Sequence, residues 1–165
     1  MRRHALHYLQ EWLIDKRRKP LVLRGARQVG KTWLVHYLAK TQHKKLIELN
    51  FEKNPGYQSF FQTNEPEKIL RNIELEMGIK INLHDSILFF DEIQIFPQLL
   101  AKLRWFYELN PALPVIAAGS LLDFVLAEHE FSMPVGRINY LHLEPLSFEE
   151  FLLAKKLEHL VTFLK

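Results

Sequence analysis

The chain contains no cysteine and no long uninterrupted apolar segment. The absence of cysteine excludes disulfides, thiolate metal sites and cysteine nucleophiles. No apolar run approaches the roughly 20 residues that a membrane-spanning helix needs. The N-terminal segment MRRHALHYLQEWL has polar residues within every apolar stretch, so it lacks the apolar region of a secretory signal. We therefore expect a soluble, cytoplasmic protein without membrane contact.

The composition is that of an ordinary globular protein, with 48% apolar and 25% charged residues among 165. This argues against a disordered chain, a collagen-like repeat and a bare coiled coil. The length corresponds to one domain, or to one domain with a short tail. The net charge is +3, and the charges are unevenly distributed along the chain. Residues 1–31 carry nine basic and only two acidic side chains. The basic end favours an anionic ligand or partner, the alternative being a solvated surface cluster.

Short apolar segments alternate with helical segments along the chain, and no repeat or linker interrupts them. Helical spacing predicts helices over 3–17, from 31, over 65–77, over 96–109 and from 147, where Ser147 and Glu150 match a capping box. Apolar runs predict strands over 21–23, 43–51, 86–90, 114–119 and 137–143. A turn is expected over 54–56. The alternation predicts an α/β fold with a mostly parallel sheet.

A phosphate-binding motif lies between the first predicted strand and the helix that follows it. Residues 25–32 read Gly25-Ala26-Arg27-Gln28-Val29-Gly30-Lys31-Thr32 and fit the pattern G-x-x-x-x-G-K-[ST]. Glycines at the first and sixth positions permit a sharp turn and a close approach of backbone N–H groups to phosphates. The Lys31 ammonium would reach the β- and γ-phosphates, and the Thr32 hydroxyl would bind Mg²⁺. A coincidental glycine turn before a helix is the alternative.

Two adjacent carboxylates end the most apolar predicted strand, which reads Ile87-Leu88-Phe89-Phe90-Asp91-Glu92. Ligands bind at the carboxyl ends of strands in open parallel sheets, and so apolar a strand should be central. Asp91 would hold Mg²⁺ through water, and Glu92 would orient and activate an attacking water. A solvated strand end is the alternative, but the phosphate motif 59 residues earlier favours the functional interpretation.

Two further polar residues are candidates for contact with the γ-phosphate. Ser120 directly follows the apolar run Val115–Gly119, where its hydroxyl could bind the phosphate or the attacking water. It could instead cap a helix. Arg137, in the sequence Gly136-Arg137, could supply positive charge to the transition state in its own subunit or in a neighbour. An ordinary surface arginine is the alternative.

The segments LVLRGARQVGKTWL, ILFFDEIQ, VIAAGSLL and VGRINYLHLEPLSFEEFL resemble a prokaryotic family of AAA-type P-loop ATPases. The resemblance implies a three-layer α/β/α sandwich with a five-stranded, mostly parallel sheet of order 5-1-4-3-2. It implies that Gly25 to Trp33 bind nucleotide and that Thr32 and Asp91 bind Mg²⁺. Lys31, Glu92, Ser120 and Arg137 would be catalytic, with Ser120 as the sensor and Arg137 as the arginine that reads the γ-phosphate. The implied ligands are ATP and Mg²⁺.

The C-terminal segment departs from the family pattern. We expect an ATPase core with an N-terminal helix over residues 1–146 and a helical tail over 147–165. Similar proteins continue into a further domain, so we expect this chain to be a fragment or the product of a shortened reading frame. The apolar tail would pack on a missing segment, on the core or on another subunit. A homo-oligomer, or a protein or DNA partner bound through the missing region, is consistent with this pattern.

Three functions are compatible with these residues. The first is Mg²⁺-dependent hydrolysis of ATP to ADP and phosphate. The second is an interaction module gated by nucleotide binding with negligible hydrolysis. The third is a small-molecule kinase, which the adjacent carboxylates Asp91 and Glu92 disfavour because they suit water as the acceptor. The residues alone do not distinguish ATP from GTP, and the resemblance favours ATP.

Overall fold

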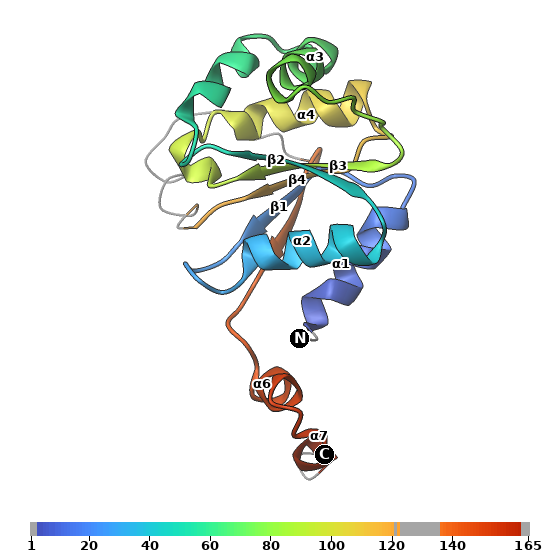
Figure 1. The fold of residues 1–165 in the computed structure, drawn as a ribbon, viewed down its shortest axis with the longest axis vertical. Helices are drawn as coiled ribbons and strands as arrows, with labels where there is room; N and C mark the ends of the chain where they lie inside the picture. Colours follow the sequence, from blue (N-terminus) through green and yellow to red (C-terminus); the bar gives the residue numbers. More distant parts are fainter. Residues whose placement is uncertain (1–2, 121, 123–135, 163–165) are drawn as a thin grey trace.

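A five-stranded parallel sheet forms the centre of the computed structural model, which describes residues 3–120, 122 and 136–162 (Figure 1). The strand order is β2-β3-β4-β1-β5, and every neighbouring pair is parallel. This order is the predicted 5-1-4-3-2 read from the other edge, so the fold prediction is confirmed. The strands are β1 (Leu21–Arg24), β2 (Lys45–Asn50), β3 (Ser86–Asp91), β4 (Val115–Ala118) and β5 (Asn139–His142).

Helices cover both faces of the sheet, as Figure 1 shows. One face carries α1 (His4–Ile14) and α2 (Lys31–Thr41), and the other carries α3 (Pro66–Met77) and α4 (Leu99–Leu109). Two 3₁₀ helices, η1 (Pro55–Gln62) and η2 (Ile93–Ile95), follow β2 and β3. None of the helices in the described ranges has the length and hydropathy of a bilayer-spanning segment.

Alternation along the strands divides the apolar core into two layers. Val22 of β1 packs in the layer under α3 and α4, whereas its neighbours Leu21 and Leu23 pack against α1 and α2. The same alternation holds in β3, where Phe90 belongs to the first layer and Phe89 to the second. All these side chains are fully buried. A sheet buried on both faces explains why its strands are continuous apolar runs.

Several element boundaries differ from the predicted ones. The helix predicted to begin at residue 96 begins at Leu99, because residues 93–95 form the separate turn η2 and Phe96 has an extended φ of −138°. The predicted turn at 54–56 is the beginning of η1, whose N-cap Asn54 accepts a hydrogen bond from the Gly56 N–H. The first helix ends at Ile14 rather than near residue 17.

The C-terminal residues form two short helices, α6 (Phe148–Ala154) and α7 (Glu158–Val161), which project from the layered part of the chain (Figure 1). The predicted capping box is present, because the Ser147 hydroxyl accepts from the Glu150 N–H and the Glu150 carboxylate accepts from the Ser147 N–H. The division into a core over 1–146 and a tail over 147–165 remains a prediction.

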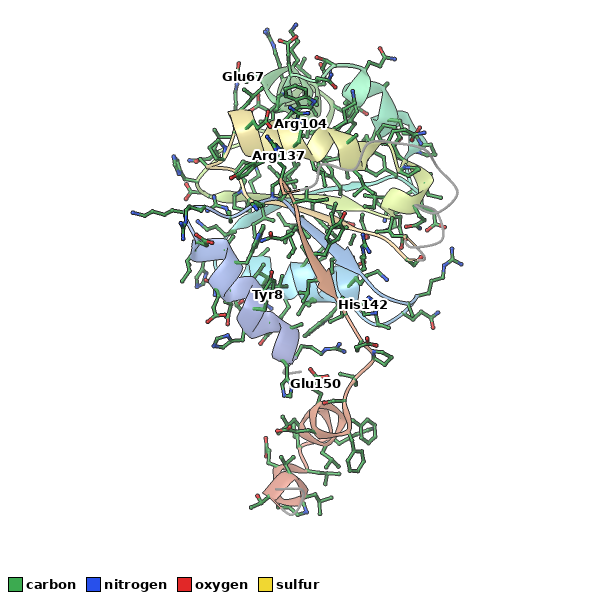
Figure 2. All side chains as sticks on the ribbon, turned by 180° about the vertical axis from the view of Figure 1, so that it is seen from behind. Tyr8, Glu67, Arg104, Arg137, His142 and Glu150 are labelled. Atoms are coloured by element: carbon green, nitrogen blue, oxygen red, sulfur yellow. The ribbon has the colours of Figure 1, made fainter. Side chains whose placement is uncertain are left out.

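A buried ion pair joins α6 to the beginning of α1. The Arg3 Nε lies 3.4 Å from Glu150 Oε1, and these side chains are only 4% and 6% exposed. Glu150 Oε1 also accepts a hydrogen bond of 2.8 Å from the His4 N–H. The Arg3 guanidinium donates to the carbonyls of Glu144 at 2.6 Å and Val29 at 3.4 Å. One arginine therefore contacts the loop of residues 25–32 (the phosphate loop), the segment after β5, and Glu150 of α6, which Figure 2 labels.

Candidate functional site

The loop that follows β1 depends on glycine for its path. Gly25 has a φ of +140°, and a Cβ atom built on it would lie 2.2 Å from the Leu143 carbonyl oxygen. That contact arises because the Leu143 N–H donates to the Arg24 carbonyl at 2.8 Å, which brings the chain after β5 against the loop. Gln28 and Gly30 also have positive φ values of 63° and 93°. The turn needs left-handed backbone at these positions.

Replacing Gly25 with alanine should therefore destabilise the protein. We expect the free energy of unfolding to fall by about 2 kcal/mol, because the methyl group meets backbone and the φ is unfavourable for an L-residue. Urea unfolding of Gly25→Ala and of Gly136→Ala measures this. Gly136 has a φ of +76° but open space around it, so it isolates the contribution of strain alone. Equal losses in the two variants would contradict the steric explanation.

Lys31 folds back over the loop from the first turn of α2. Its Nζ donates to the carbonyls of Gly25 at 2.9 Å and Ala26 at 2.7 Å. Burial lowers the pKa of the Lys31 ammonium, while the negative charges of Glu92 and Asp91 oppose that shift. The N-cap of α2 is Gly30, which has no side chain to cap the first N–H groups of the helix. These N–H groups and the ammonium together form a site suited to phosphate.

Asp91, the last residue of β3, lies beside Thr32. The Thr32 hydroxyl donates to Asp91 Oδ2 at 3.1 Å, and the Asn50 side-chain amide donates to the same oxygen at 3.2 Å. Burial raises the pKa of Asp91, with further contributions from the charges of Glu92 and Glu48, and the Thr32 hydrogen bond opposes the rise. Asn50 was not predicted as a site residue, although its position at the carboxyl end of a predicted strand could have indicated it.

The side chain of Gln94, a residue without a predicted role, connects Glu92 to Ser120. Glu92 has a left-handed backbone with φ 56°, and its Oε2 accepts from Gln94 Nε2 at 2.5 Å. Gln94 Oε1 accepts from the Ser120 N–H at 3.2 Å. Ser120 is 2% exposed, and its Oγ has no hydrogen-bond partner within the part of the chain that the structure describes. A buried unpaired hydroxyl at this position suits contact with a polar ligand atom.

Several of these residues line a cavity of about 340 Å³ at the carboxyl edge of the sheet, whereas Asp91, Asn50 and Gln94 lie behind its lining. Its walls include Arg27, Gln28, Gly30, Lys31, Thr32 and Trp33 of the predicted binding segment, together with Glu92 and Ser120. Glu52, which follows β2, also lines it and was missed. Of the remaining predicted loop residues, Ala26 contributes its carbonyl to Lys31, and Val29 packs against the apolar layer beneath α1 and α2.

Arg137 does not lie at this cavity. It precedes β5, and the register of β5 with β1 pairs Asn139 with Leu21 and His142 with Arg24. The phosphate loop follows Arg24, so Arg137 lies at the opposite edge of the sheet, and Figure 2 shows Arg137 and His142 at the two ends of β5. The Arg137 Nε donates to Glu108 Oε1 at 2.9 Å, and this hydrogen bond lowers the pKa of Glu108.

The donor set fits Mg²⁺ bound together with phosphate. Thr32 and Asp91 present hard oxygen atoms 3.1 Å apart at the edge of the loop. Across the described residues, no group of three or more His, Asp or Glu side chains could form a cage for a metal ion. Mg²⁺ characteristically takes one or two protein oxygens and completes its shell with water and substrate phosphates.

The sequence comparison agrees with this geometry. A family model described as an AAA domain matches residues 17–152, which is more than half of the chain. No curated protein matches the chain. The matched range includes the phosphate loop, Asp91 and Glu92, Ser120 and the strand that contains Asn139. The parallel sheet of order β2-β3-β4-β1-β5 is also the arrangement of a P-loop NTPase. The chain therefore belongs to the AAA domain family and has the P-loop NTPase fold.

Proposed function

We propose that the protein binds ATP with Mg²⁺ and hydrolyses it to ADP and phosphate. The observation that carries this proposal is the convergence of Lys31, Thr32, Glu92 and Ser120 on one cavity, with Asp91 bonded to Thr32. A cation, metal-binding oxygens, a carboxylate and an unpaired hydroxyl are the groups that phosphoryl transfer to water requires. Membership of the AAA domain family favours ATP as the nucleotide.

Each residue has a distinct role in this proposal. The Lys31 ammonium exchanges its bonds to the Gly25 and Ala26 carbonyls for phosphate oxygens. Thr32 and Asp91 would hold Mg²⁺, which when bound neutralises charge on the phosphates. Glu92 orients a water and accepts its proton as the water oxygen bonds to the γ-phosphorus and the bond to ADP breaks. The Ser120 hydroxyl donates to a γ-phosphate oxygen.

We propose that the nucleoside part of ATP binds in a second cavity beside the phosphate loop. This cavity has a volume of about 500 Å³ and shares Arg27, Gln28 and Gly30 with the first. Pro145 and Leu146 supply apolar surface there, and Arg3 lies on its wall. A flat purine suits such a partly apolar pocket. The triphosphate would then pass along the loop from one cavity to the other.

The position of Arg137 bears on assembly. Arg137 lies at the end of β5 opposite to the phosphate loop, does not line the cavity of its own chain and is bonded to Glu108. We therefore propose that Arg137 contacts the γ-phosphate bound by a neighbouring copy of the chain within a homo-oligomer. Its pairing with the exposed Glu108 leaves it at the surface, where a second subunit can approach.

The decisive experiment measures nucleotide affinity and phosphate release for the wild type and for Lys31→Ala. Loss of one charge-assisted contact should weaken Mg²⁺–ATP binding about 10- to 100-fold. Lys40→Ala is the matched control, since it removes the same charge from an exposed position of the same helix. Calorimetric titration gives the affinity, and a phosphate-release assay gives the rate. Equal affinity in the Lys31→Ala variant and the wild type would refute the proposed site.

A second function is favoured by the exposed aromatic side chains of α6. Phe148 is 63% exposed and Phe151 is 43% exposed, on a helix tied to the loop through Arg3 and Glu150. This arrangement suits a module whose contacts through α6 respond to nucleotide. Tight binding of ATP by the wild type without phosphate release would support the interaction module and exclude the hydrolase. Preferential phosphate transfer to a metabolite would support a kinase.

A further inference from the structure

We propose that Gln94 is a positioning residue for hydrolysis, because its side chain holds the Glu92 carboxylate in a defined position relative to Ser120. This inference rests on the proposed function and adds a residue to it. Gln94 belongs to η2, the turn that follows Asp91 and Glu92, and its side-chain amide bridges Glu92 after β3 and Ser120 after β4. No other side chain in the described ranges is seen to bond both Glu92 and Ser120.

The amide of Gln94 can satisfy its two partners in only one orientation. Its Nε2 donates to Glu92 Oε2 at 2.5 Å, and its Oε1 accepts from the Ser120 N–H at 3.2 Å. Rotating the amide by 180° would place an oxygen against a carboxylate and an NH₂ group against an N–H group. The two ends of the side chain are therefore chemically matched to an acceptor and a donor. Of the common side chains, only glutamine and asparagine carry a carboxamide, which places an NH₂ donor and a carbonyl acceptor side by side on one planar group.

The surrounding backbone restricts where the Gln94 side chain can lie. A Cβ atom on Gly119 would be 2.8 Å from Gln94 Oε1, so the amide lies directly against the glycine. The η2 turn is held by hydrogen bonds from the Ile95 N–H to the Glu92 carbonyl at 3.1 Å and from the Phe96 N–H to the Ile93 carbonyl at 2.9 Å. Ile93 is fully buried and anchors the turn in the apolar core.

The consequence is a defined position for the carboxylate that would activate water. A free glutamate side chain samples several rotamers, and few of them orient one oxygen toward an attacking water. With Oε2 bonded to Gln94, Oε1 is the oxygen that accepts the proton of the water. The same amide also accepts from the Ser120 N–H. The position of the Glu92 carboxylate is therefore fixed relative to Ser120, whose hydroxyl would contact the γ-phosphate. Gln94 thus acts through Glu92 and does not itself touch substrate.

Two substitutions of Gln94 test this role by steady-state ATP hydrolysis. Gln94→Ala removes both hydrogen bonds. Gln94→Glu keeps an acceptor for the Ser120 N–H but places negative charge against Glu92. We expect kcat to fall about 10- to 100-fold in both, and in Gln94→Ala, which adds no charge, KM and Mg²⁺–ATP affinity should stay within about twofold of the wild type. Gln98→Ala is the control, because Gln98 is an exposed glutamine nearby whose side chain does not cap α4.

A double-substitution cycle separates positioning from general structural damage. If Gln94 acts through Glu92, adding Gln94→Ala to Glu92→Gln should change the residual single-turnover rate by less than about twofold. A further fall similar to that in the single variant would overturn the inference, as would parallel losses of kcat and nucleotide affinity. Wild-type kcat in Gln94→Ala would also overturn it and leave the proposed hydrolysis intact. Absence of turnover in the wild type would refute both.

Discussion

Replacing Glu92 with glutamine should lower kcat for ATP hydrolysis about 1000-fold and leave Mg²⁺–ATP affinity within a few-fold of the wild type. Glutamine has the shape of glutamate but cannot accept the proton of the attacking water. The side-chain carbonyl of the introduced glutamine can still accept the hydrogen bond from Gln94 Nε2, so the local geometry should persist. Removing a negative charge beside Lys31 should, if anything, favour binding of an anionic nucleotide.

Single-turnover phosphate release and calorimetric titration of the purified 165-residue chain measure the two quantities. Glu67→Gln is the control, because it makes the same chemical change on α3, away from the cavity (Figure 2). A loss of affinity as large as the loss of rate would mean that Glu92 supports binding rather than the chemical step. Unchanged turnover would remove Glu92 from the site, while the phosphate loop would retain its binding role.

The second large effect concerns stability, and it arises at the buried Arg3–Glu150 pair. Replacing Glu150 with alanine should lower the free energy of unfolding by about 3 kcal/mol, which corresponds to a midpoint roughly 10 °C lower. The substitution leaves Arg3 buried without its charged partner, and it removes the acceptor for the His4 and Ser147 N–H groups. Glu149→Ala is the matched control, since it removes the same group from the adjacent position of α6.

The pH dependence of stability provides a second measurement of the same interaction. Burial alone would raise the pKa of Glu150, but hydrogen bonds from the His4 and Ser147 N–H groups and the charge of Arg3 outweigh it and hold the pKa below its ordinary value of 4.5. A carboxyl group whose folded pKa is depressed stabilises the fold above its unfolded pKa and loses that contribution as pH falls through the folded pKa.

Thermal unfolding of the wild type and the Glu150→Ala variant should therefore converge as pH is lowered below about 4 and differ most near neutrality. A constant difference at all pH values would show that the loss reflects missing side-chain volume rather than charge. An unchanged midpoint, with faster proteolysis of α6 alone, would show that the helix unfolds independently of the core and that the pair does not stabilise the whole domain.

Much of the fold and part of the site follow from patterns that are local in the sequence. The apolar run Leu21 to Leu23, the glycines of the phosphate loop and the helical spacing after Lys31 specify a strand, a turn and a helix within about 20 residues. The capping box at Ser147 and Glu150 is equally local. Once the strands are parallel, Asp91, which ends β3, and Ser120, which follows β4, must lie at the same edge of the sheet as the loop.

Other features depend on contacts between residues far apart in the chain, which no local pattern specifies. Arg3 meets Glu150 across nearly the whole sequence, and Asn50 meets Asp91 only because β2 and β3 are paired in that register. The family resemblance implied a role for Arg137 toward the γ-phosphate of its own subunit or of a neighbour, and the direction of β5 places it at the end of the strand opposite to the phosphate loop of its own chain. The succession of strands and helices and the chemistry of the loop follow from the sequence pattern, and the strand order was implied by the family resemblance, whereas the partner of each polar group is decided by the packing that brings distant segments together.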